Sequence, residues 1–203
     1  MKTLINISAD KIAIFGFGDP VFLERNGVDM QIGKVLVALD RKYGFSSCLV
    51  INGPGGFTNL RVGSLALNLL KTLKNNQFSL YSLSKIELYQ KAYQYGILPR
   101  YGVIYIGQKS NVWLWDFDQQ VLQATIKKDQ IGALLEEYGQ IFLDEVYDLG
   151  YFAFPDLQVQ SRFVEQGILL TFADKELLLN WEELCTDEVS QLQPNYMMNP
   201  NLG

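Results

Sequence analysis

The sequence predicts an α/β protein in which mixed β-sheets are flanked by helices and the chain is built from two related halves. Short apolar runs alternate with longer amphipathic segments along most of the 203 residues. The order three strands, helix, strand, helix begins at the N-terminus and is partly repeated after Pro99. With 48% hydrophobic and 19% charged residues, the composition is that of a folded globular protein.

The first half reads as five strands and three helices. Asp29 and Thr58 are placed as helix N-caps, and Gly44 is placed as a helix C-cap. Strands are expected at Thr3–Ser8, Lys11–Phe17, Pro20–Arg25, Ser47–Asn52 and Gln77–Ser82, and helices at Asp29–Tyr43, Thr58–Lys74 and Leu83–Tyr95.

The second half starts again with strands after the break at Leu98-Pro99-Arg100. The expected subdomains are therefore residues 1–99 and residues 100–203, the second one smaller and acidic. Strands are expected at Tyr101–Gly107, Asn111–Phe117, Gln120–Ile126 and Gln140–Asp144, and helices at Lys128–Tyr138 and Asp174–Leu184.

The composition removes several classes of catalyst. The chain has no histidine, which excludes Ser-His-Asp and Cys-His catalysis and any histidine-bearing metal site. Its two cysteines, Cys48 and Cys185, are too few for a disulfide framework and are not spaced as metal ligands. Carboxylates remain, so composition alone leaves glycosidase-like and phosphoryl-transfer chemistry open, and no metal is expected.

The formal net charge of −5 conceals an asymmetry between the halves. Residues 1–100 carry 12 Lys/Arg and 6 Asp/Glu, whereas residues 101–203 carry 5 Lys/Arg and 16 Asp/Glu. The second half is therefore not expected to bind nucleic acid, which requires clustered cations. Any RNA-facing surface would come from cations of the first half, and the alternative is an ordinary solvated face. The candidates are Arg25, Lys34, Arg41, Lys42, Lys71 and Lys74.

No stretch of the sequence approaches the roughly 20 apolar residues that a membrane-spanning helix requires. The opening residues, MKTLINISADK, have neither a long apolar run nor a small-residue cleavage site. We therefore expect no membrane association and a cytoplasmic location.

One segment has a specific pattern. The run from Ile51 to Gly63, INGPGGFTNLRVG, places a glycine-rich turn between an apolar strand and a helix. It resembles the signature of the TsaB (YeaZ) family, a strand followed by GPGSFTGLRIG, with Gly56 in place of Ser and Asn59 in place of Gly. Residues 80–84, LYSLS, resemble the family's next strand and helix start, and residues 194–198, PNYMM, resemble its terminal PxYLR motif. Residues 105–109, YIGQK, stand where the family has an IDAR-type segment, but they lack its Asp and Arg.

This resemblance implies an actin-like (ribonuclease H-like) fold and a non-catalytic role. It implies a scaffold that pairs with a TsaD-like catalytic subunit, assisted by a TsaE-like ATPase, in the threonylcarbamoyladenosine modification of transfer RNA. The RNA would then be contacted only through the complex.

Two alternatives stay open. The glycine-rich turn at the start of a helix could hold phosphate, as in a small actin-like ATP-dependent phosphotransferase using Asp10. The turn lacks the Lys and Ser/Thr of a Walker loop, however. Asn6 also stands where actin-like proteins present a magnesium-organising Asp. A rigid turn with no cofactor is therefore the preferred interpretation. The other alternative is a self-associating structural homodimer.

The two long helices of the first half each show two apolar faces. The stripe Val62, Leu65, Ala66, Leu69 and Leu73, and the stripe Ile32, Val35, Leu36, Leu39 and Tyr43, are predicted to cover the sheet. The opposite faces are predicted to bind the partner, as the resemblance implies, or else to pack within the chain. These partner-binding residues are Met30, Gly33, Val37, Leu60, Gly63, Leu67 and Leu70.

Overall fold

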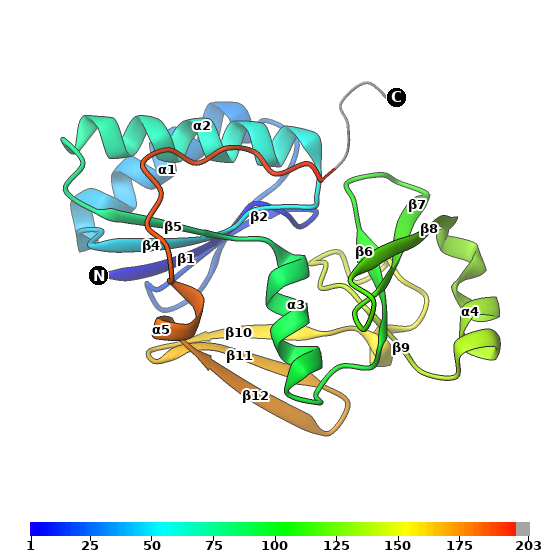
Figure 1. Cartoon of the computed structure of the whole chain (residues 1–203). Helices are drawn as coiled ribbons and strands as arrows, with labels where there is room; N and C mark the ends of the chain where they lie inside the picture. The colour runs from blue at the N-terminus through cyan, green and yellow to red at the C-terminus, as the bar shows by residue number, and fades with distance from the viewer. Residues whose placement is uncertain (198–203) are drawn as a thin grey trace.

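The computed structural model describes residues 1–197, and its first sheet is formed by the N-terminal half (Figure 1). The strands lie in the order β3-β2-β1-β4-β5. Strands β1, β2 and β3 pair antiparallel, and β4 and β5 continue the sheet parallel to β1. The five strands span Lys2–Asn6 (β1), Ile12–Phe15 (β2), Val21–Leu23 (β3), Ser47–Ile51 (β4) and Ser79–Leu83 (β5).

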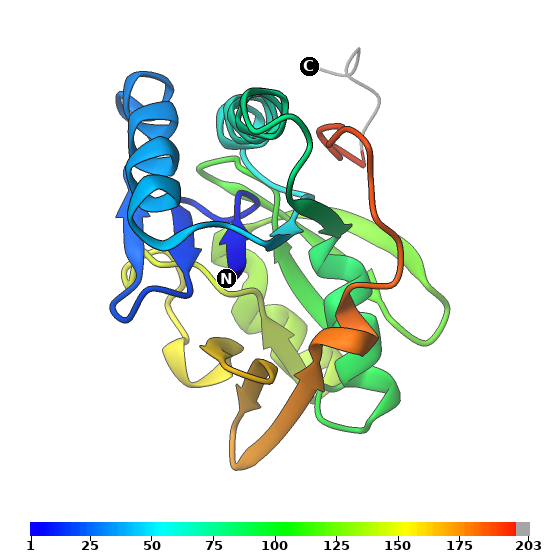
Figure 2. The same ribbon diagram turned by 90° about the vertical axis from the view of Figure 1, so that its left-hand side faces the viewer.

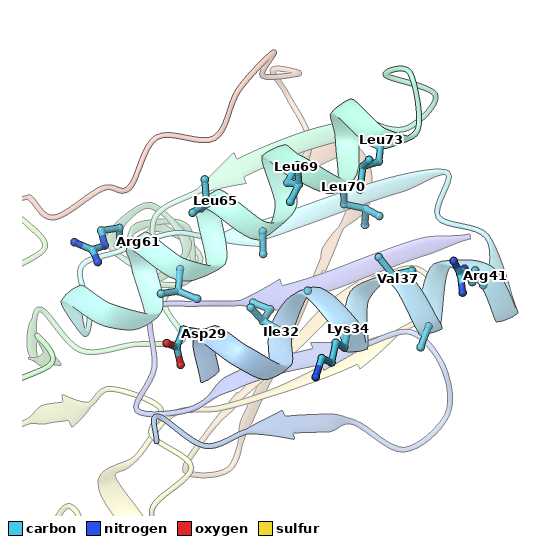
Figure 3. A pocket seen from close by; sticks show the side chains of 14 residues that line it. Asp29, Ile32, Lys34, Val37, Arg41, Arg61, Leu65, Leu69, Leu70 and Leu73 are labelled. Carbon is cyan, nitrogen blue, oxygen red and sulfur yellow. The ribbon is translucent and has the colours of Figure 1, made fainter. Parts of the chain in front are cut away.

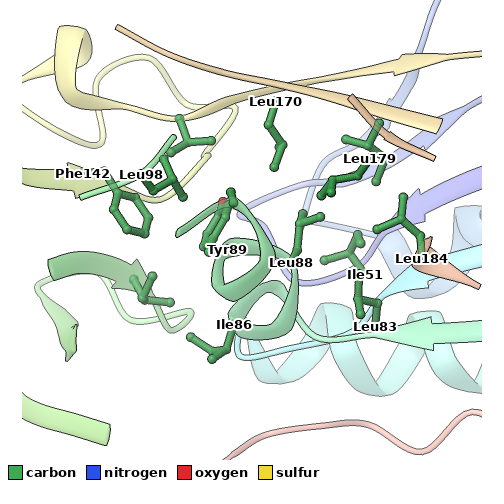
Figure 4. Close-up of a cluster of buried hydrophobic side chains, with 14 of the residues drawn as sticks. Ile51, Leu83, Ile86, Leu88, Tyr89, Leu98, Phe142, Leu170, Leu179 and Leu184 are labelled. Atoms are coloured by element: carbon green, nitrogen blue, oxygen red, sulfur yellow. The ribbon is translucent and has the colours of Figure 1, made fainter. Parts of the chain in front are cut away.

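Two long helices, α1 (Val28–Tyr43) and α2 (Phe57–Leu73), cover one face of this sheet, as Figure 2 shows from the side. A buried apolar cluster lies between them and the strands, with Ile5 and Ile7 among its members. The helix α3 (Lys85–Gln94) packs on the opposite face through Leu88 and Tyr89. Figure 4 shows this second cluster.

The second sheet repeats the arrangement of the first. Its order is β8-β7-β6-β9, with β6, β7 and β8 antiparallel and β9 parallel to β6. A helical segment joins β8 to β9 as α1 joins β3 to β4. The elements span Tyr101–Tyr105 (β6), Asn111–Asp116 (β7), Val121–Lys127 (β8), Lys128–Gln130 (a 3₁₀ turn), Ile131–Tyr138 (α4) and Ile141–Leu143 (β9). Repeated topology, mixed sheets and flanking helices confirm the fold class expected from the sequence.

A third sheet, β10-β11-β12, was not foreseen. Its strands are Gln160–Val164 (β10), Gly167–Phe172 (β11) and Lys175–Asn180 (β12), preceded by a 3₁₀ turn at Pro155–Leu157 and followed by the short helix α5 (Trp181–Leu184). The helix predicted at Asp174–Leu184 was wrong over most of its length. Its glutamate and leucines favour helix locally, but pairing with β11 buries Leu179 and leaves Leu178 exposed, an alternation that fits only a strand.

The chain after α5 returns to the first sheet. Glu188 forms an isolated antiparallel bridge with Tyr81 of β5, and the Val189 N–H donates to the Leu80 carbonyl at 2.8 Å. Leu192 is buried in the cluster under α1 and α2. Residues 188–197 thus pack with the N-terminal half, and the subdomain boundary at 99/100 stays a prediction.

The helix starts differ slightly from expectation. The N-caps of α1 and α2 are Gly27 and Gly56, each two residues before the predicted caps Asp29 and Thr58. Gly44 ends α1 with φ 71°, as predicted. Ser84 caps α3 and accepts from the Glu87 N–H at 3.1 Å.

In residues 1–197, no helix combines the length and the apolar character that crossing a membrane requires.

Candidate partner-binding site

A long groove runs between α1 and α2 on the side that faces away from the sheet (Figure 3). Its volume is about 750 Å³. Its lining is mostly apolar and comes from both helices: Ile32, Gly33, Val37 and Ala38 of α1, and Val62, Leu65, Ala66, Leu69, Leu70 and Leu73 of α2. Four charged residues, Asp29, Lys34, Arg41 and Arg61, complete it.

The α2 side of the groove carries three leucines one helical turn apart. Leu65, Leu69 and Leu73 are 68%, 57% and 65% exposed. Residues at i, i+4 and i+8 form one ridge along a helix. Met30 of α1 is also exposed, at 69%. Large contiguous apolar surface is uncommon on monomeric proteins and marks a contact with another molecule.

The two faces of α2 are the reverse of the prediction. Leu60, Gly63, Leu67 and Leu70, predicted to bind a partner, are buried against the first sheet, although Leu70 also lines the floor of the groove. The predicted sheet stripe contains instead the most exposed leucines of the helix. Both stripes have helical spacing and similar residues, so amphipathicity could not rank them.

The close packing of Gly63 on Ile7 is consistent with only one face of α2 lying against the sheet. A Cβ built on Gly63 would lie 2.6 Å from Cγ2 of Ile7, so the glycine lets α2 approach the end of β1 closely. The close approach inferred for this glycine is therefore between helix and sheet. The neighbouring Asn59 side chain, also buried, donates to the carbonyls of Ala9 and Asp10, both at 3.1 Å. In the sequence, the polar residue Asn59 is the feature that could have identified the sheet-facing side of α2.

The partner-binding residues predicted on α1 are not buried, unlike those predicted on α2. Gly33 and Val37 line the groove, whereas Met30 is exposed but is not one of the lining residues. The predicted sheet stripe of α1 is inside only in part, with Ile32 and Leu36 buried and Tyr43 exposed. Gly33 differs from Gly63, because a Cβ built there would meet no atom within 4 Å.

Two cations proposed to face RNA are engaged inside the protein. Lys71 is buried and donates to the Val189 carbonyl at 2.9 Å and to Glu188 at 3.3 Å. Lys74 pairs with Asp40 at 2.6 Å. Lys34 and Arg41, by contrast, lie at the groove between α1 and α2.

The glycine-rich turn before α2 is a packing junction. A Cβ on Gly55 would overlap the backbone of Ser8, and a Cβ on Gly53 would overlap the backbone of Asn195. Gly107, after β6, approaches Gly56 equally closely. Three segments from distant parts of the chain therefore meet at this turn, which requires glycine at each contact.

The region between the two sheets is closed by a buried ion pair. Lys85, at the start of α3, donates to Asp144 after β9 at 2.5 Å, and both side chains are almost fully buried. Asp144 also accepts from the Tyr89 hydroxyl at 2.6 Å and from the Tyr105 N–H at 2.8 Å. Burial lowers the pKa of Lys85, and the Asp144 carboxylate opposes that shift. This network joins the two halves through buried polar groups that are hydrogen-bonded to one another.

The residues considered for a magnesium site have other partners. Asn6 accepts from the Ser8 N–H at 3.0 Å and donates to the Tyr147 hydroxyl at 3.2 Å. Asp10 accepts from the Tyr147 N–H at 2.7 Å. Over residues 1–197, no three His, Cys, Asp or Glu side chains are grouped as a metal site.

Comparison with known proteins finds partial structural similarities and no sequence match. No protein-family model and no curated protein matches the sequence. Among solved structures, the chain is similar to YeaZ from Pseudomonas aeruginosa, with 16% identity and a TM-score of 0.35 over 62% of this chain and 66% of that one. It is also similar to an uncharacterized protein with similarity to peptidase YEAZ from Pseudomonas aeruginosa, with 16% identity and a TM-score of 0.39 over 70% and 74% of the two chains.

Proposed function

We propose that this chain is a non-catalytic scaffold that pairs, through the groove between α1 and α2, with a TsaD-like catalytic subunit of transfer-RNA threonylcarbamoyladenosine modification. The observation that carries the proposal is the exposed ridge of Leu65, Leu69 and Leu73 beside that groove. Burying a fully exposed leucine side chain is favourable by about 1.5–3 kcal/mol. These leucines, 57–68% exposed, would gain a corresponding fraction of that free energy on complete burial. A partner that covers the ridge supplies that burial.

Gly33 supports the same surface. Glycine inside a helix costs about 1 kcal/mol relative to alanine. At Gly63 that cost is offset by close packing on Ile7, but at Gly33 no atom lies within 4 Å of a Cβ position. Close approach of a partner's backbone to α1 would supply the missing compensation.

The rest of the assembly follows from the resemblance of residues 51–63 to the TsaB family. In this proposal a TsaE-like ATPase completes the complex, transfer RNA is reached only through it, and the chain works in the cytoplasm without a cofactor of its own. The competing phosphotransferase function finds no support in the glycine-rich turn, because Gly55 and Gly56 face the backbone of Ser8 and Gly107.

The test is co-purification of this chain with the TsaD-like protein of the same organism, followed by a threonylcarbamoylation assay with and without the chain. We expect a stable complex and modification that depends on both proteins. The isolated chain should show no magnesium-dependent ATP turnover above a heat-inactivated control. ATP turnover that disappears in Asp10→Ala would overturn the non-catalytic assignment.

Two glycine variants locate the contact. Gly33→Leu should keep or raise the free energy of unfolding, because the site is open, and it should abolish pairing by filling the groove. Gly132→Ala, in α4 and remote from the groove, should raise stability similarly and leave pairing unchanged. If folded Gly33→Leu pairs normally, the groove is not the contact.

A further inference from the structure

A lysine side chain lies where the two repeated sheets meet. Lys85 is the first residue of α3, which stands between these sheets (Figure 1). Its ammonium group donates to the Ser8 carbonyl at 3.3 Å, to the Tyr105 carbonyl at 2.8 Å and to Asp144 Oδ2 at 2.5 Å. Ser8 follows β1, Tyr105 ends β6 and Asp144 follows β9. These three oxygens, which come from both halves of the chain, form the oxygen site.

The number of acceptors indicates that Lys85 carries its charge. A protonated amine has three N–H donors, and each atom of the oxygen site accepts one of them. A neutral amine has only two N–H groups, and its lone pair would face the third oxygen. Burial lowers the pKa of Lys85, and the carboxylates of Asp144, Asp10 and Glu145 oppose that shift.

The oxygen site is held together by contacts that do not involve Lys85. Asp144 accepts from the Tyr105 N–H at 2.8 Å. Asn6 Oδ1 accepts from the Ser8 N–H at 3.0 Å and from the Ser8 hydroxyl at 2.9 Å, which fixes the turn that carries the Ser8 carbonyl. The Tyr105 carbonyl belongs to β6, which pairs with β7 along its whole length. The three oxygens should therefore keep their positions when the lysine side chain is shortened.

The space beside Lys85 is too small for a second ligand. The cavity there has a volume of about 10 Å³ and is lined by polar side chains of both halves, among them Asn6, Asp144, Glu145 and Tyr147. A single water molecule needs about that much room. A hydrated metal ion or a nucleotide therefore does not fit next to the lysine.

We propose that the oxygen site is a binding site for a primary ammonium ion, which the chain fills with its own Lys85 and thereby closes to any other cation. Two carbonyls and one carboxylate match a single positive charge with three donors. The carbonyls lie at the ends of equivalent strands, because β1 and β6 each pair antiparallel with the next strand and parallel with a later one. The cation between them joins the two repeated units. The site is separate from the groove, because none of its residues lines the groove.

The first test vacates the oxygen site. Lys85→Ala removes three methylene groups and the ammonium group, which together have the size and charge of a propylammonium ion. The Tm of this variant should lie below that of wild type. It should rise by at least about 3 °C when about 0.1 M propylammonium chloride replaces the same concentration of tetramethylammonium chloride. Wild type should have the same Tm in both salts, because its site is already filled.

Three controls separate the oxygen site from a general effect of the ion. Lys71→Ala removes another buried lysine, which donates to the Val189 carbonyl at 2.9 Å and to the half-exposed Glu188. Water reaches that carboxylate, so the two salts should give this variant the same Tm. In Lys85→Ala/Asp144→Asn the carboxylate is lost, and propylammonium should have no specific effect. Uncharged 1-propanol should stabilise Lys85→Ala less than propylammonium does at the same concentration.

The second test uses the wild-type chain. The ammonium protons of exposed lysines exchange rapidly with water, whereas those of an ammonium group with three buried acceptors exchange slowly. NMR of a nitrogen-labelled sample at about pH 7 should show an NH₃⁺ signal that is missing from Lys85→Arg. A neutral-amine signal for Lys85, or no signal that depends on this residue, would overturn the assignment of the site.

The remaining outcomes also decide the question. A Lys85→Ala variant that gains nothing specific from propylammonium, or that stays unfolded in both salts, would contradict the proposal, because a bound ion supplies the charge that was removed. An equal gain in Lys71→Ala would do the same. A gain that survives Asp144→Asn would show that the ion only fills the space of the side chain. These measurements involve no partner, so their failure is distinct from a failure of pairing with the TsaD-like protein.

Discussion

Gly63 of α2 lies directly over Ile7 at the end of β1, with room for a hydrogen but not for a methyl group. This contact sets the height of α2 above the first sheet and turns the ridge of Leu65, Leu69 and Leu73 towards solvent. The face of α2 that carries this glycine is therefore the buried one, and the opposite face contributes the ridge to the groove.

The first prediction compares the two glycines. Gly63→Ala should destabilise the protein by about 1–3 kcal/mol despite the better helix propensity of alanine, because the methyl group forces α2 or Ile7 to shift. Gly33→Ala should stabilise it by up to about 1 kcal/mol. Urea unfolding followed by circular dichroism measures both. Equal effects of the two substitutions would contradict the placement of α2.

The second prediction concerns two leucines on opposite faces of α2. Leu67→Ala should cost about 2–5 kcal/mol, because Leu67 is fully buried. Leu65→Ala should change the free energy of unfolding by about 0.5 kcal/mol or less, because Leu65 is mostly exposed. For binding to the TsaD-like protein the order of the two effects should be reversed. Leu65→Ala should lower the affinity more than Leu67→Ala does. Isothermal titration calorimetry on the folded variants measures this.

The third prediction concerns the buried ion pair. Lys85→Met leaves Asp144 buried without its cation and should cost about 3–5 kcal/mol in unfolding free energy. Adding Asp144→Leu to the same chain should recover part of the loss, because no unpaired charge remains. Thermal unfolding of the two single variants and the double variant gives the coupling. Additive single effects would mean that the pair does not act as a unit.

The fourth prediction is a pH dependence set by Glu145. Burial raises the pKa of this carboxyl from 4.5 to about 7, against the opposing hydrogen bonds from Ser161. The folded state thus binds a proton that the unfolded state has lost between these two values, and stability should fall as the pH rises through this window. Below the window the contribution is constant.

Glu145→Gln should flatten this slope, because the amide does not titrate. The readout is the midpoint of urea unfolding between about pH 4.5 and pH 7.5. Glu183→Gln is a suitable comparison, because hydrogen bonds lower the pKa of that exposed carboxyl and its linkage lies at more acidic pH. A wild-type slope that survives in Glu145→Gln would assign the titration to another group.

The sequence by itself determined the elements of the two repeated sheets. Alternating apolar runs placed β1 to β9 within a few residues, and Gly44 marked the end of α1 because its positive φ favours glycine. These features depend on neighbours in the chain. The resemblance of residues 51–63 to one family is likewise a local property of the sequence.

Only the tertiary structure decided which side of each element is covered. β12 is a strand because β11 supplies its hydrogen bonds, although its residues favour helix. The two stripes of α2 are equivalent in pattern, and tertiary contacts such as those of Gly63 with Ile7 and of Asn59 with the Ala9 and Asp10 carbonyls select one for the core. Lys71 and Lys74 count as cations in the sequence, but Glu188 and Asp40, both distant along the chain, neutralise them. Burial and pairing depend on residues that folding brings together, and no local pattern specifies those partners.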